Sequence, residues 1–153
     1  MVNVILVYVL MNLLQKDKAR SLIAGLLFAA HPVLAEAVNC ISFNEDLLTT
    51  SFFIVSLILY SKVKADITKP RIQLYILSLL FFLLALFSKE MAITLPGIIL
   101  LYDLTLRDTQ NENLSVKRFV SIIKNRLFYY AGYFGVSLFY LYLRFFVFYN
   151  QKE

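Results

Sequence analysis

The sequence predicts an all-α membrane protein with about six transmembrane helices. Of its 153 residues, 60% are hydrophobic and the mean hydropathy is +0.72, whereas an ordinary globular chain is roughly half apolar. The apolar residues gather in six runs, and the basic residues gather in every second segment between them. We therefore predict a single polytopic membrane domain over residues 1–153, without a separate soluble domain at either end.

The six apolar runs are read as spans, although several are shorter than the roughly 20 residues that a spanning helix requires. Flanking polar residues or a thinner bilayer must make up the difference. The first run lacks a basic stretch before it and a cleavage site after it, so it is read as a helix and not as a signal peptide. In chain order the predicted helices are Met1–Leu14, Ser21–Val38, Leu47–Tyr60, Ile72–Phe87, Met91–Leu106 and Leu127–Tyr149.

Three sequence signals modify these helices. Pro32 disfavours helix at the residue before it, so the second helix should kink or end near His31. The third helix is preceded by Ser42-Phe43-Asn44-Glu45, which has the spacing of a capping box. Pro96 and Gly97 should interrupt the fifth helix, and the sixth is about half Phe and Tyr.

The charge of the loops predicts the topology. Lys and Arg are concentrated in Gln15–Arg20, Ser61–Arg71 and Arg107–Arg126, and basic loops remain cytoplasmic. Both termini and the two remaining loops are then extracytoplasmic. An integral membrane location follows, in the bacterial inner membrane or in the endoplasmic reticulum of a eukaryote.

The first extracytoplasmic loop holds most of the candidate catalytic residues. His31, Glu36 and Asp46 lie at the edge of apolar runs, where polar groups are costly and usually serve a function. Simpler explanations remain open, because Glu36 could be an interfacial acid and Asp46 lies in a first helical turn, where the helix dipole favours an anion. The hydroxyls of Thr49, Thr50 and Ser51, on the same helix as Asp46, can bond back to the helix carbonyls and need no other partner.

Candidate phosphate ligands lie in two further places. One is the second extracytoplasmic loop, Ser88-Lys89-Glu90, and the other is Arg144 near the outer end of the last helix. A cation at the outer membrane edge suits a lipid phosphate, although a lysine at a helix end can also simply extend toward the aqueous interface. Lys89 and Arg144 together suggest an anion site at the outer leaflet. Asp103 is expected to pair with Arg107, four residues further on.

These residues also carry a family resemblance. His31-Pro32-Val33-x-x-Glu36-Ala37-Val38 followed by Asp46-Leu47-Leu48, and Ser88-Lys89-Glu90-x-x-Ile93-Thr94 followed by Leu101-Tyr102-Asp103, occur in that order. This arrangement resembles the TMTC-type proteins, which are membrane O-mannosyltransferases with tetratricopeptide repeats, and their bacterial relatives. Leu143-Arg144 also fits.

The resemblance implies a partial GT-C-like helical bundle and a glycosyltransferase. Such enzymes pass a sugar from a polyprenyl-phosphate carrier to a protein or glycan acceptor on the non-cytoplasmic side. By this resemblance Asp46, with Glu36 and His31, forms the catalytic group, while Lys89, Glu90 and Arg144 bind the lipid phosphate. The expected partners are that donor, its acceptor and membrane lipid, without nucleic acid.

The chain also departs from the family pattern. Phe43-Asn44 replaces the family's Gly-Arg, Leu34 replaces a histidine, and residues 1–153 contain no tetratricopeptide repeat. Family members have one more helix in front, followed by a loop with the principal catalytic acids. We therefore expect a front part of the enzyme that is inactive alone.

Chemistry leaves two further questions open at this stage. Sugar transfer requires a carboxylate base for the acceptor and Arg, Lys or a metal for the departing phosphate, so a divalent metal is the cofactor to consider. The alternative function is a non-catalytic membrane protein, either a subunit that binds lipid carriers or a small transporter. A decayed enzyme is the third reading.

Overall fold

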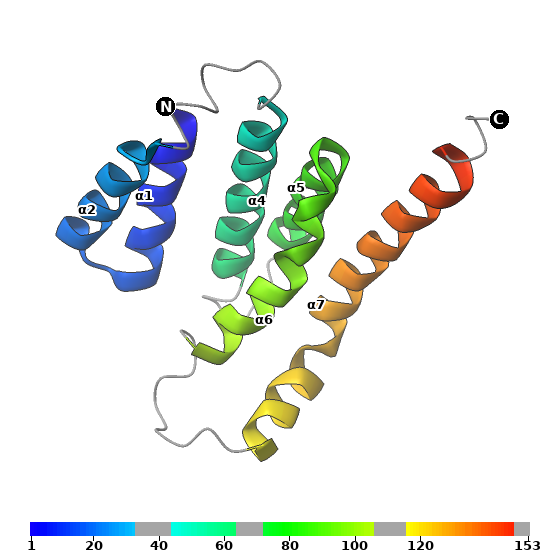
Figure 1. The fold of residues 1–153 in the computed structure, drawn as a ribbon. Coiled ribbons are helices and arrows are strands. Elements are labelled where there is room, and N and C mark those ends of the chain that lie inside the picture. Colours follow the sequence, from blue (N-terminus) through cyan, green and yellow to red (C-terminus); the bar gives the residue numbers. More distant parts are fainter. Residues whose placement is uncertain (33–43, 64–71, 106–115, 149–153) are drawn as a thin grey trace. The chain divides into compact units, whose positions relative to one another are not determined.

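The computed structural model describes residues 1–32, 44–63, 72–105 and 116–148, apart from the side chains of 116–125, 147 and 148 (Figure 1). Its described elements are all helical, which confirms the all-α prediction. The chain divides into two compact units, Met1–Ala92 and Ile93–Glu153. The elements are α1 (Val2–Gln15), α2 (Lys18–Ala29), α4 (Asn44–Val63), α5 (Ile72–Ser88), η2 (Glu90–Thr94), α6 (Leu95–Thr105), α7 (Val116–Tyr142) and η3 (Leu143–Phe148).

In the first unit, α1 and α2 form a helical hairpin with a two-residue connection. Lys16 adopts a left-handed conformation with φ of 54° and closes α1, its amide donating to the Asn12 carbonyl. The Asp17 side chain then caps α2, because Oδ1 accepts from the amides of Ala19 at 2.9 Å and Arg20 at 3.4 Å. This cap explains why α2 begins before the predicted Ser21.

Small residues allow the two hairpin helices to approach closely. Ser21 and Gly25, four residues apart, are the buried positions of α2. A Cβ placed on Gly25 would lie 3.6 Å from the Cβ of Tyr8 and 3.8 Å from the Val4 carbonyl oxygen. Pairs of small residues at this spacing are typical of helices that pack in membranes.

The predicted break at Pro32 is confirmed, because α2 ends at Ala29 with Ala30 as its C-cap. The His31 amide donates to the Phe28 carbonyl at 3.3 Å, which tightens the final turn. The remainder of the predicted second span lies in residues 33–43, outside the described part of the chain.

The centre of the first unit is the antiparallel pair α4 and α5. Ser56 and Ser78 are fully buried, and each hydroxyl donates to the other residue's carbonyl oxygen, at 2.8 and 2.6 Å. About one helical turn from the serines, the ring centroids of Phe52 and Phe81 lie 6.0 Å apart. Since these contacts keep one register, the end of α5 lies beside the start of α4.

Only part of the span prediction is supported. Within the described residues, α4 is the one helix long and apolar enough to cross a membrane, while α1 and α5 are apolar but shorter. Twenty residues of α4 extend about 30 Å, the thickness of a bilayer core. A count of six spans remains a prediction.

The second unit differs from the prediction at both of its helices. The expected interruption near Pro96 takes the form of a 3₁₀ segment ending at Thr94, after which α6 starts with Pro96 in its first turn, where proline is tolerated. The last helix begins at Val116, well before the predicted Leu127, and ends as a π-helix over Leu143–Phe148.

The early start of α7 has a simple cause in the sequence. Val116, Phe119, Val120 and Ile123 recur at helical spacing among the basic residues, which is the pattern of an amphipathic helix. The prediction treated Arg107–Arg126 as one basic loop because it weighed charge above periodicity.

Candidate functional site

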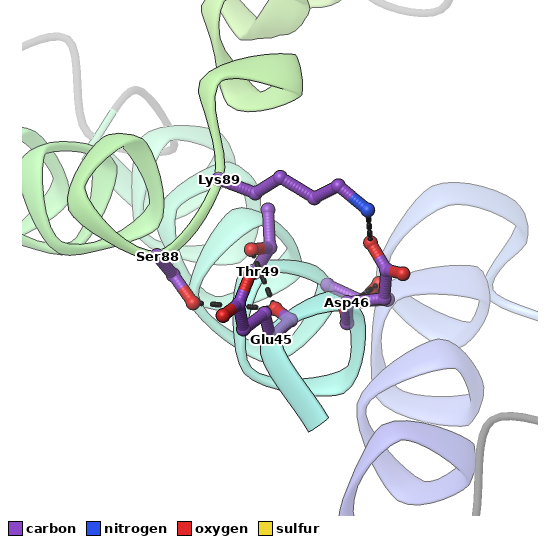
Figure 2. Close-up of polar contacts among 6 residues, drawn as sticks. Glu45, Asp46, Thr49, Ser88 and Lys89 are labelled. Atoms are coloured by element: carbon purple, nitrogen blue, oxygen red, sulfur yellow. Dashed lines mark hydrogen bonds and ion pairs between the residues drawn. The ribbon is translucent and has the colours of Figure 1, made fainter. Parts of the chain in front are cut away.

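The first unit brings together the two candidate residues that the sequence placed in separate loops. Asp46 lies in the first turn of α4, and Lys89 follows the last residue of α5. The Lys89 Nζ forms an ion pair with the Asp46 Oδ1, and each side chain is 39% exposed (Figure 2). A carboxylate and an ammonium group therefore share one partly solvated position at one end of the α4–α5 pair.

The backbone around this ion pair is held by separate contacts. Ser88 Oγ donates to the Glu45 carbonyl oxygen at 3.2 Å, and Thr49 Oγ1 donates to the same oxygen at 2.7 Å. Figure 2 shows both hydroxyls directed at Glu45. The Lys89 amide donates to the Ala85 carbonyl at 2.9 Å. This hydrogen bond fixes the backbone of Lys89, from which its long side chain extends.

Asn3 is a polar contact that sequence reasoning missed. Its Nδ2 donates to the Leu47 carbonyl at 3.0 Å, and Ser51 Oγ lies 2.5 Å from its Oδ1. Asn3 is only 8% exposed, so its amide ties α1 to the turn of α4 that carries Asp46. The signal available in the sequence was one amide within an otherwise apolar run.

The predicted back-bonding of the α4 hydroxyls is confirmed. Thr49, Thr50 and Ser51 each donate to the carbonyl four residues earlier, at 2.7, 2.7 and 2.8 Å. Ser51 has Asn3 as an additional neighbour. These residues therefore serve the local structure of α4, and none of these hydrogen bonds reaches Asp46's carboxylate.

The other predicted site residues are not brought to the ion pair. His31 is exposed after the end of α2, and Glu36 lies outside the described residues. Glu90 is exposed at the start of η2. Arg144 is exposed in η3 and donates to the Tyr140 hydroxyl at 3.4 Å. Since Arg144 belongs to the second unit, its predicted partnership with Lys89 remains a prediction.

The second unit contains a buried charge cluster that the sequence did not reveal. Asp103 is 1% exposed; its Oδ1 forms an ion pair with Arg126, and its Oδ2 accepts from the Tyr130 hydroxyl at 2.7 Å. The expected partner, Arg107, lies outside the described residues. These contacts join α6 to α7, so Asp103 has a structural role that spacing along one helix did not indicate.

The described site places a cationic group that can bind an anion beside a carboxylate. The ammonium of Lys89 can bind a phosphate oxygen, and the Asp46 carboxylate can accept a hydroxyl proton. Among the described side chains, no three His, Cys, Asp or Glu residues gather as metal ligands.

Comparison with known proteins identifies relatives of one kind. The chain is 34% identical over 87 residues to protein O-mannosyl-transferase TMTC3 of Mus musculus, and 32% identical over 87 residues to TMTC3 of Homo sapiens, covering 57% of this chain and 10% of each relative. It is 29% identical over 122 residues to protein O-mannosyl-transferase TMTC1 of Mus musculus, covering 75% of this chain and 13% of that relative.

These similarities support the resemblance to TMTC-type proteins over part of the chain. The chain spans about a tenth of the length of these curated relatives. No family model matches it, and no solved structure matches it. The class that fold and comparisons define together is thus an all-helical chain similar to a short segment of protein O-mannosyl-transferases.

Proposed function

We propose that this chain belongs to the TMTC-type family and forms part of a membrane glycosyltransferase. The enzyme transfers a mannose-like sugar from a polyprenyl-phosphate carrier to a protein or glycan acceptor on the extracytoplasmic side. The observation that carries this proposal is the ion pair between Asp46 and Lys89, because it joins the two sequence blocks that carry the family resemblance. The relatives named O-mannosyl-transferases also support it.

Each group has a separate role in the proposed reaction. Lys89 binds the phosphate of the lipid carrier and stabilises its charge as the sugar leaves. Asp46 orients the acceptor or the donor and accepts a proton. By the family resemblance, His31, Glu36 and Glu90 are further candidate residues for this reaction, and Arg144 is a second candidate ligand for the donor phosphate.

The test is donor binding to the purified protein in nanodiscs. A photoreactive polyprenyl-phosphate mannose should label the wild-type protein, and excess undecaprenyl phosphate should compete while the uncharged undecaprenol should not. Lys89→Met should reduce labelling at least tenfold, because it removes the cation but keeps the length of the side chain. Lys62→Met, which changes an exposed lysine at the opposite end of α4, is the matched control.

Two outcomes separate the candidate functions. Equal labelling of wild type and Lys89→Met, or equal competition by undecaprenol, would refute the phosphate site. Phosphate-dependent labelling without sugar transfer to any acceptor, measured with radiolabelled mannose on the complete gene product, would instead favour a non-catalytic subunit that binds lipid carriers.

A further inference from the structure

The cation assigned to the donor phosphate is already occupied by a carboxylate of the same chain. We propose that the Asp46–Lys89 ion pair is an exchangeable latch. The donor phosphate displaces the Asp46 carboxylate from Lys89, and the carboxylate becomes available to the acceptor only while the donor is bound. This inference rests on the proposed function and adds a coupling between donor binding and release of the acid.

The exposure of the ion pair makes the exchange feasible. Both side chains are 39% exposed, so neither charged group is enclosed by the protein and a competing anion can approach the pair. For ion pairs with this exposure, the equilibrium constant favours the paired over the separated side chains by only about two- to fivefold. A phosphate with several acceptor oxygens at the same position competes effectively with one carboxylate.

The surrounding contacts allow the latch to open without moving the helices. Ser88 and Thr49 hold the Glu45 carbonyl, and the buried hydroxyls of Ser56 and Ser78 join α4 to α5. None of these hydrogen bonds uses the Asp46 carboxylate or the Lys89 ammonium. Opening therefore requires only a change of side-chain rotamers, on the long and adaptable stem of lysine.

Electrostatic repulsion explains why Asp46 leaves Lys89 when the phosphate binds. Asp46 lies in the first turn of α4, and its carboxylate pairs with Lys89. When a phosphate anion reaches Lys89, the phosphate and the Asp46 carboxylate compete for one ammonium group, and their like charges repel. The Asp46 side chain then turns away, and its carboxylate becomes available to the acceptor hydroxyl. The exchange makes and breaks only noncovalent contacts.

The test measures the affinity of undecaprenyl phosphate for the protein in phosphatidylcholine nanodiscs. Asp46→Asn removes the competing charge while keeping the shape of the side chain, so it should tighten binding by about two- to fivefold. Asp46→Ala should tighten it similarly. Lys89→Met should weaken binding at least tenfold. Adding Asp46→Asn to Lys89→Met should cause no recovery, because no cation then remains for which phosphate and Asp46 compete.

Two controls isolate the ion pair. Glu45→Gln makes the same change of charge one residue away, and should alter the affinity by less than twofold. With undecaprenol as the probe, wild type and Asp46→Asn should bind equally, because an uncharged head group does not compete for Lys89. Unchanged circular dichroism and elution volume establish that each variant is folded.

The possible results distinguish the latch from the proposed function. If Lys89→Met abolishes binding but Asp46→Asn and Asp46→Ala weaken it or leave it unchanged, then Asp46 is a direct ligand or a bystander, and the latch is wrong while the phosphate site stands. If Lys89→Met binds like wild type, both proposals fail. Tightening by the Asp46 variants that disappears in the Lys89 background supports both.

Discussion

At the residue scale, Asp103 shows how burial decides the importance of one charge. Its carboxylate is 1% exposed and is held by Arg126, whose side chain is 20% exposed, and by Tyr130. Removing one partner of a buried ion pair leaves the other charge without compensation, which is strongly destabilising. Spacing along α6 could not predict these partners, because both lie on α7.

We predict that Asp103→Asn lowers the free energy of unfolding by about 3–5 kcal/mol, the usual range for breaking a buried ion pair. The double change Asp103→Leu with Arg126→Met should recover much of this loss, since neither charge then remains buried alone. Unfolding by titration with denaturing detergent, followed by circular dichroism, provides the measurement.

Thr105→Ala is the control for this prediction. Its exposed hydroxyl donates to the Leu101 carbonyl of its own helix, so its removal should change the free energy of unfolding by less than about 0.5 kcal/mol. A loss in Asp103→Asn as small as this would show that the cluster contributes little to stability.

At the element scale, the packing of α4 on α5 depends on two buried serines. Each hydroxyl donates to the other residue's carbonyl, and the two hydroxyl oxygens lie 3.1 Å apart. The small side chains let the helices approach, and the hydroxyls satisfy one another away from water. The sequence displayed these residues only as isolated serines within apolar runs.

We predict that Ser56→Ala and Ser78→Ala each lower the free energy of unfolding by about 0.5–1.5 kcal/mol, as is typical for hydrogen bonds between membrane helices. The double variant should lose less than the sum of the two, because the hydroxyls share one network. Unfolding in detergent measures all three. Ser61→Ala, whose hydroxyl donates to the Ile58 carbonyl of the same helix at 2.7 Å, should have little effect; strict additivity would contradict the shared network.

The elements themselves were largely predictable because apolar length and helix-stop signals are local. Pro32 correctly predicted the end of α2, and the apolar runs correctly predicted α1, α4 and α5 to within a few residues. The start of α7 was predicted wrongly, because a helix that carries many basic residues looks like a loop when charge alone is considered.

At the scale of the whole molecule, the remaining question is which ends of the helices face the same side of the membrane. The antiparallel contacts of α4 and α5 put Asp46 and Lys89 at one end, as the charge-based topology required. Lys62 is exposed in the last turn of α4, at its other end. The structure thus agrees with the alternation of loops, while the side of the membrane remains a prediction.

We predict that cysteines replacing His31 and Met91, both exposed, react with a membrane-impermeant maleimide applied to the extracytoplasmic side, after expression in a bacterial inner membrane. Cysteines replacing Lys18 and Lys62 should react only after permeabilisation, because the basic segments are expected to be cytoplasmic. Labelling in a Cys40→Ser background provides the measurement. Reaction of His31→Cys and Met91→Cys from opposite sides would contradict the prediction that both loops are extracytoplasmic.

The sequence by itself determined the all-helical class, the helix end before Pro32 and the two polar blocks, because hydropathy and backbone geometry act over a few neighbouring residues. Only the tertiary structure decided that Lys89 pairs with Asp46, that Asn3 supports the same turn and that Asp103 is held from α7. These partners lie on different helices, so the register and packing of the helices bring them together, and no local spacing encodes that register.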